Sequence, residues 1–116
     1  MKDINGKIQY KGKEYAAVFN LNVMEQIQDK YGTLDAWGKL TDGTSSGEPD
    51  AKAVIFGFTA MINEGIEIEN DENGTDIKPL TTRQVGRIIS DVGLHDATAV
   101  LNDTVIKSTE GESKNE

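Results

Sequence analysis

The chain has 116 residues, no cysteine and a formal net charge of −8. Its length is typical of one domain, and the absence of cysteine excludes disulfides and thiolate metal sites. The charge is uneven, because residues 1–40 carry a net +1 and residues 41–116 carry a net −9. Binding to nucleic acid requires a basic surface, so neither nucleic acid nor an anionic membrane is an expected partner.

The sequence contains no run of about 18 apolar residues, so no membrane span is expected. The residues after Met1 lack the apolar stretch of a signal peptide. We therefore expect a cytoplasmic protein, and the lack of cysteine fits that expectation.

The N-terminal residues alternate between apolar and polar, which predicts a β-hairpin. The apolar positions on either side of a turn at residues 11–13 are Ile8, Tyr10, Tyr15, Ala17, Phe19 and Leu21. A lone hairpin is only marginally stable in water, so its apolar face is expected to pack on the helices that follow.

The apolar spacing changes from two residues to about 3.6 at Asn22, which is expected to cap the first helix together with Glu25. Gly32 is expected to end this helix, and Thr33 to cap a second helix over residues 34–40.

A third helix is predicted from a cap at Asp50 to a stop at Gly65, after a loop over residues 41–49. Residues 66–78 alternate isoleucine with acidic residues at their start, which favours a second small hairpin, with a mobile acidic loop as the alternative.

A fourth helix is expected to begin at a capping box made by Thr81 and Gln84 and to end at Gly93, and a fifth helix follows. Residues 108–116 include no apolar residue and are predicted to form a disordered polar tail. The globular domain is therefore expected to span residues 1–107.

The predicted fold class is α+β, mainly α, with an N-terminal β-hairpin packed on a bundle of four to five short helices. The expected core consists of residues on the apolar stripes of these elements: Phe19, Met24, Ile27, Val54, Ile55, Phe58, Ile62, Val85, Ile88, Ile89 and Leu101.

Few residues suggest chemistry, so we expect no catalytic site, no metal and no cofactor. An EF-hand register that starts at Glu69 fails because Leu80 occupies the position of the bidentate glutamate. His95 is the single histidine, and no serine lies in the setting of a nucleophile, so a surface or capping role is expected for it.

The densest positive group is Lys78, Arg83 and Arg87, and the two arginines lie four residues apart on one predicted helix face. A site for an acidic partner is one interpretation, and a solvated helix face is the other. Similarly, Tyr31, Trp37 and Phe58 could form a ligand cage, but a small domain more often uses its few aromatic residues in the core or at an interface.

Three segments together resemble the tail assembly chaperones of long-tailed bacteriophages and prophages of Gram-positive bacteria. The segments are YKGKEYAAVFNLNVMEQIQDKYGTLDAW, AKAVIFGFTAMINEGIEIEN and KPLTTRQVGRIISDVG. The resemblance covers roughly residues 7–106. It rests on motifs that begin or end helices, such as Y-G-T-L-D at the end of the first helix, rather than on catalytic motifs.

The resemblance implies a non-catalytic protein that binds the tape-measure protein, keeps it soluble and helps to recruit tail-tube subunits. Such a chaperone would act in the host bacterial cytoplasm and be absent from the mature virion. Many relatives also have a longer product that is made by a programmed frameshift.

Contact with the partner, and self-association if it occurs, is expected through apolar side chains near the hairpin and the first two helices. The candidates are Tyr15, Met24, Tyr31, Trp37 and Leu40. For Trp37, burial in the core is an equally open interpretation. Two other classes also remain open: a structural tail or head-tail connector component retained in the virion, and a small enzyme or regulator.

Overall fold

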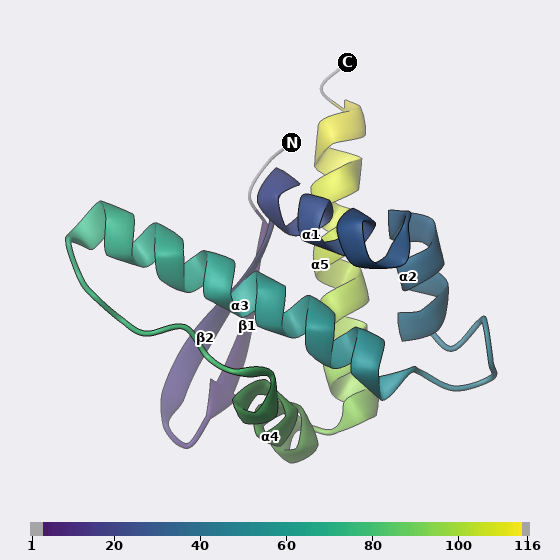
Figure 1. The fold of residues 1–116 in the computed structure, drawn as a ribbon, viewed down its shortest axis with the longest axis horizontal. Coiled ribbons are helices and arrows are strands. Elements are labelled where there is room, and N and C mark those ends of the chain that lie inside the picture. Colours follow the sequence, from purple (N-terminus) through teal and green to yellow (C-terminus); the bar gives the residue numbers. More distant parts are fainter. Residues whose placement is uncertain (1–3, 115–116) are drawn as a thin grey trace.

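The chain folds as an N-terminal hairpin packed against five helices (Figure 1). The computed structural model describes the backbone of residues 4–114 and the side chains of residues 6–108. Helices account for 66% of the chain and strands for 12%, which confirms the predicted α+β, mainly α, class.

The alternating residues at the start of the chain form the predicted antiparallel hairpin. Strand β1 (Ile4–Tyr10) pairs with strand β2 (Lys13–Phe19) across a two-residue turn. The turn residues Lys11 and Gly12 have φ angles of 50° and 78°, the positive values that the tightest hairpin turns require. Glycine adopts such a φ freely, whereas lysine does so only at a cost in backbone energy.

Helix α1 (Leu21–Tyr31) begins one residue before Asn22, the predicted capping residue. Its cap is Asn20, whose side-chain oxygen accepts hydrogen bonds from the backbone N–H groups of Asn22 and Val23 at 3.1 and 3.3 Å. The side-chain amide N–H groups of Asn20 and Asn22 donate to the buried carboxylate of Glu64, at 2.7 and 3.1 Å. The prediction that Asn22 is the cap was therefore wrong, because Asn20 has the extended backbone of a cap and Asn22 already lies inside α1.

The glycine stop and the two caps that follow α1 are confirmed. Gly32 has a φ of 89° and ends α1, and the hydroxyl of Thr33 accepts the backbone N–H of Ala36 at 3.0 Å. Helix α2 (Leu34–Thr41) starts at this cap. Asp50 caps the third helix through a 2.9 Å hydrogen bond.

Helix α3 (Ala51–Asn73) continues well beyond Gly65, so the predicted second hairpin at residues 66–78 was wrong. A Cβ atom at Gly65 would lie 2.8 Å from the carbonyl oxygen of Ala16 on β2. This glycine lets the helix backbone approach the sheet closely and does not end the helix. The stop lies at Gly74, which has the left-handed φ of 66° typical of a helix end.

Two asparagines of α3 hold the segment that leads back to the fourth helix. Asn70 donates to the carbonyl of Ile77 at 3.0 Å and accepts its N–H at 2.9 Å. Asn63 makes the same pair of bonds with Leu80, at 2.9 and 2.8 Å. The segment between Gly74 and the next helix is therefore attached to α3 by four side-chain hydrogen bonds.

Helix α4 (Thr82–Val92) begins at the predicted capping box, in which Thr81 and Gln84 bond reciprocally, and it ends at Gly93. Helix α5 (Leu94–Lys114) follows directly. It continues through residues where a disordered tail was expected from residue 108. The buried Ser108 hydroxyl, which donates to the carbonyl of Phe19 at 3.5 Å, attaches this part of α5 to the hairpin.

The long helix α3 crosses the hairpin and contacts every other helix, while α5 packs against β1 (Figure 1). Nine of the eleven predicted core residues are buried, and Met24 and Ile55 are partly buried. The fold therefore has one core, to which the hairpin and all five helices contribute residues.

Candidate functional site

The tryptophan that was a candidate for partner contact lies in the core. Trp37 is 1% exposed, and its indole N–H donates to the carbonyl of Ala53 at 3.0 Å. The indole lies over Gly57 of α3, where a Cβ atom would come within 2.4 Å of the ring carbon Cζ2. Of the two interpretations open from the sequence, the structure shows core packing between α2 and α3.

The other four candidates, Tyr15, Met24, Tyr31 and Leu40, are partly buried and pack against the core. They do not line a common cavity. Tyr15 borders a hollow of about 210 Å³ between β2 and α3, whereas Tyr31 meets Phe56 edge-on, with ring centroids 5.6 Å apart. Their role in partner binding stays a prediction.

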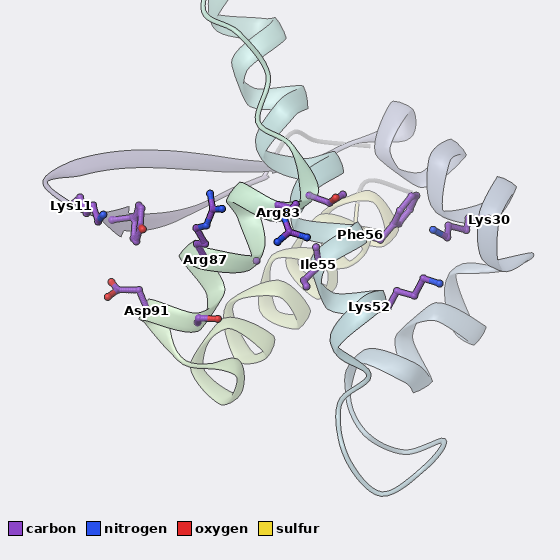
Figure 2. A pocket seen from close by; sticks show the side chains of 12 residues that line it. Lys11, Lys30, Lys52, Ile55, Phe56, Arg83, Arg87 and Asp91 are labelled. Atoms are coloured by element: carbon purple, nitrogen blue, oxygen red, sulfur yellow. The ribbon is translucent and has the colours of Figure 1, made fainter.

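A surface groove of about 1030 Å³ runs from the hairpin turn, along α3 and α4, to α1 (Figure 2). We call it the cationic groove, because its rim carries five positive side chains: Lys11, Lys30, Lys52, Arg83 and Arg87. Its apolar floor includes Tyr10, Ile55, Phe56 and Gly86. Asp91 is the one acid among the described residues that line it.

The five cations reach the groove from four different elements. Arg83 and Arg87 lie on the outer face of α4, because the inner face of this helix is buried in the core. Lys11 is in the hairpin turn, Lys30 in the last turn of α1, and Lys52 in the first turn of α3. The folded chain thus gathers charges that are far apart in the sequence.

None of the five groove cations forms an ion pair with another described residue. The three ion pairs between described residues join Lys7 to Glu14, Lys39 to Asp35 and Lys107 to Asp103, all outside the groove.

Aromatic rings lie beneath two of the groove lysines instead. The ammonium of Lys30 is 4.7 Å from the ring centroid of Phe56, and that of Lys11 is 5.3 Å from the centroid of Tyr10. Such cation–π contacts stabilise a cation without cancelling its charge. An apolar floor with unpaired cations around it can bind a ligand that is both apolar and negatively charged.

Two of the three cations singled out in the sequence, Arg83 and Arg87, line the groove and are exposed on the outer face of α4, so both interpretations of this pair stay predictions. The third, Lys78, borders the smaller hollow beside Tyr15. Sequence reasoning missed Lys11, Lys30 and Lys52, since no local pattern links them.

A second hollow, of about 550 Å³, lies on the other side of Phe56, between α3 and the segment that follows it. Glu64, Glu67 and Asp76 line it, and no lysine or arginine is among its described lining residues. Phe56 therefore lines both a hollow with positive side chains and one with negative side chains.

The residues examined for metal or acid–base chemistry do not converge. Glu69, Asp71 and Asn73 lie on helix α3, and His95 is exposed near the start of α5. Within residues 6–108 the structure has no cluster of three or more histidine or carboxylate side chains that could hold a metal ion.

Among the side chains of residues 6–108, two have a clearly shifted pKa. Burial, and then the negative charge of Asp50, raise the pKa of the Tyr31 hydroxyl above its usual value. Hydrogen bonds from the hydroxyl and then the backbone N–H of Thr44 lower the pKa of Asp42. Neither group lines the cationic groove, so neither shift bears on what the groove binds.

Comparisons with protein-family models, curated proteins and solved structures found no match to this chain. In the part of the chain that the structure describes, no helix has the length and apolar character needed to cross a membrane.

Proposed function

We propose that this protein is a non-catalytic phage tail assembly chaperone. It binds the tape-measure protein in the host bacterial cytoplasm, keeps that protein soluble and helps to recruit tail-tube subunits. In this role it leaves the tail before the virion is complete.

Two lines of argument support this proposal. The first is the resemblance of residues 7–106 to this family, carried by the segments that form β2 with α1, most of α3, and α4 with its cap. The second, which carries the binding role, is the cationic groove of about 1030 Å³. Grooves with an apolar floor accept the apolar face of an amphipathic helix, which is a common mode of peptide recognition.

Co-expression with the tape-measure protein of the same phage tests the proposal. We expect the tape-measure protein to become soluble and to elute with this protein from a sizing column. If it is equally soluble without this protein, and no complex elutes, the chaperone assignment is wrong.

Mass spectrometry of purified virions separates the proposal from its alternative. A chaperone is expected to be absent from the particle. Detection of this chain at the copy number of a tail or connector subunit would assign it instead as a structural component.

A further inference from the structure

We propose that the cationic groove binds an acidic amphipathic helix of a partner protein, with a large apolar side chain of that helix seated on Phe56. The inference rests on the proposed role as a binding protein and adds the chemistry of the segment that is bound. It does not depend on which protein supplies that segment.

The charge distribution is the first argument. The whole chain has a net charge of −8, yet the groove brings together five cations and one carboxylate. None of the five takes part in an ion pair between described residues. A local positive field on an otherwise acidic protein attracts negative segments and repels positive ones, which gives both steering and selectivity.

The spacing of the cations is the second argument. Figure 2 shows Lys11 at one end of the groove, Lys30 and Lys52 at the other end, and the two arginines between them. A single phosphate or carboxylate would need several donors that converge on one point. Cations spread along a groove match several carboxylates spaced along one face of a helix.

The apolar floor is the third argument. Ile55 and Phe56 are only partly buried, and a Cβ atom at Gly86 would meet just Ile55, at 3.6 Å. The floor between α3 and α4 is therefore accessible to an apolar side chain from outside. A ligand with charge alone would leave this surface exposed to water.

The acidic hollow beyond Phe56 argues against a nucleic acid as the occupant. A long polyanion that left the groove along α3 would meet Glu64, Glu67 and Asp76. A short acidic helix that lies along the groove between Lys11 and Lys30 does not enter this hollow. The observations thus favour a protein segment of limited length.

A direct binding measurement tests the inference. The probe is a fluorescein-labelled helical peptide of about 14 residues, with leucine and phenylalanine at i, i+3, i+4 and i+7 and glutamate on the flanking positions. Fluorescence anisotropy is measured with the full chain. We expect saturable binding that weakens as salt is raised, because salt screens exposed charges.

The decisive variant is Arg83→Glu combined with Arg87→Glu, which should weaken binding at least about tenfold by placing like charges in the groove. The matched control is Lys39→Glu combined with Lys107→Glu, which changes the net charge equally outside the groove. The control should bind as the wild type does. Thermal melts of both variants verify that each remains folded.

A peptide with glutamine in place of glutamate should bind at least about tenfold more weakly, because it keeps the apolar anchor and loses the charge. Phe56→Ala should also weaken binding of the acidic peptide, whereas Ile106→Ala, on the exposed side of α5, should not.

The inference is overturned if the acidic peptide does not bind or if the arginine variant binds it unchanged. It is also overturned if both double variants lose affinity equally, if the glutamine peptide binds as tightly, or if a single-stranded oligonucleotide binds more tightly than the peptide. Concentration-dependent self-association that blocks the peptide would assign the groove to a second copy of this chain instead.

The tape-measure experiment separates this inference from the proposed function. If the wild type does not bind the acidic peptide but holds the tape-measure protein in solution, the groove inference fails and the chaperone proposal stands. If the wild type binds the acidic peptide but leaves the tape-measure protein insoluble, the chaperone proposal fails and the groove inference stands.

Discussion

The contact between the buried indole and the glycine beneath it makes a sharp test of how α2 packs on α3. Gly57→Ala places a methyl group 2.4 Å from Cζ2 and 3.1 Å from Cε2 of Trp37. The ring cannot move away easily, because its N–H is hydrogen-bonded to Ala53 and the side chain is 1% exposed. Trp37→Phe removes the ring atoms that the methyl group would strike.

The expected energies follow from opposing terms. Overpacking in a buried site costs up to about 3 kcal/mol, while replacing glycine by alanine in a helix gains about 1 kcal/mol. Gly57→Ala should therefore destabilise the protein by about 2 kcal/mol. Trp37→Phe should also cost about 2 kcal/mol, from lost packing and a lost hydrogen bond. The double variant avoids the clash and keeps the gain in helix propensity, so it should lose only about 1 kcal/mol.

Urea and thermal unfolding, followed by circular dichroism, measure these differences; Trp37 is the only tryptophan, so its fluorescence is lost in two of the variants. At about 2.1 cal/mol/K per residue, 1 kcal/mol corresponds to about 4 °C in melting temperature for this chain. Each single variant should melt about 8 °C lower, and the double variant about 4 °C lower.

Gly38→Ala is the matched control, since Gly38 also lies in a helix, next to Trp37 in the chain, but a Cβ atom there would meet nothing within 4 Å. It should stabilise the protein slightly. The packing argument is refuted if the two single effects add to within about 0.5 kcal/mol in the double variant, or if Gly57→Ala is as harmless as the control.

Three further outcomes are expected. Asn63→Ala removes both side-chain hydrogen bonds to Leu80. It should therefore speed amide hydrogen exchange in residues 74–81 and lower the free energy of unfolding in urea by about 1–2 kcal/mol. Unchanged exchange would mean that these two hydrogen bonds do not hold the segment. Glu64→Ala leaves the two asparagine amides at the start of α1 without their acceptor, so urea unfolding should show a loss of about 2 kcal/mol; a loss below about 0.5 kcal/mol would contradict this network. The pKa of Asp42 should rise in Thr44→Val when it is followed by NMR titration, since the hydroxyl that lowers it is gone. The stability that this carboxylate contributes is present above its ordinary pKa and is lost as the pH falls through its lowered pKa. The variant should therefore lose the part of that acid-side dependence that comes from the hydroxyl, while the backbone N–H of residue 44 and Lys39 keep the rest; an identical titration curve in both proteins would contradict the stated cause.

Local signals in the sequence predicted most of the elements, because caps and turns depend on neighbouring residues. The capping box at Thr81, the stop at Gly32 and the two-residue hairpin turn each involve groups a few positions apart. The predictions that were wrong concern residues whose role depends on a contact with a residue far away in the sequence. Gly65 resembles a helix stop in the sequence, but its role is the close approach of α3 to Ala16.

The candidate site was less predictable than the fold. The pair Arg83 and Arg87 was visible as an i,i+4 pattern on one helix, but three lysines join them only through the packing of the hairpin turn, α1 and α3. Trp37 could not be assigned from the sequence either, because tryptophan is common both at interfaces and in cores. The contacts of its indole with Gly57 and Ala53 in the folded chain show that Trp37 is a core residue.

The packing of the hairpin against α5 has a consequence for the order of folding during translation. The buried bond from Ser108 to Phe19 joins residues 89 positions apart, and a Cβ atom at Gly6 would lie 2.5 Å from the hydroxyl of Thr104. At 5–20 residues per second, the ribosome needs roughly 4 to 18 s to supply the helix that covers β1. During that interval β1 lacks the cover of α5, and apolar surface that is exposed on a nascent chain promotes aggregation. A protein proposed to shield another chain thus passes through a stage in which it needs shielding itself.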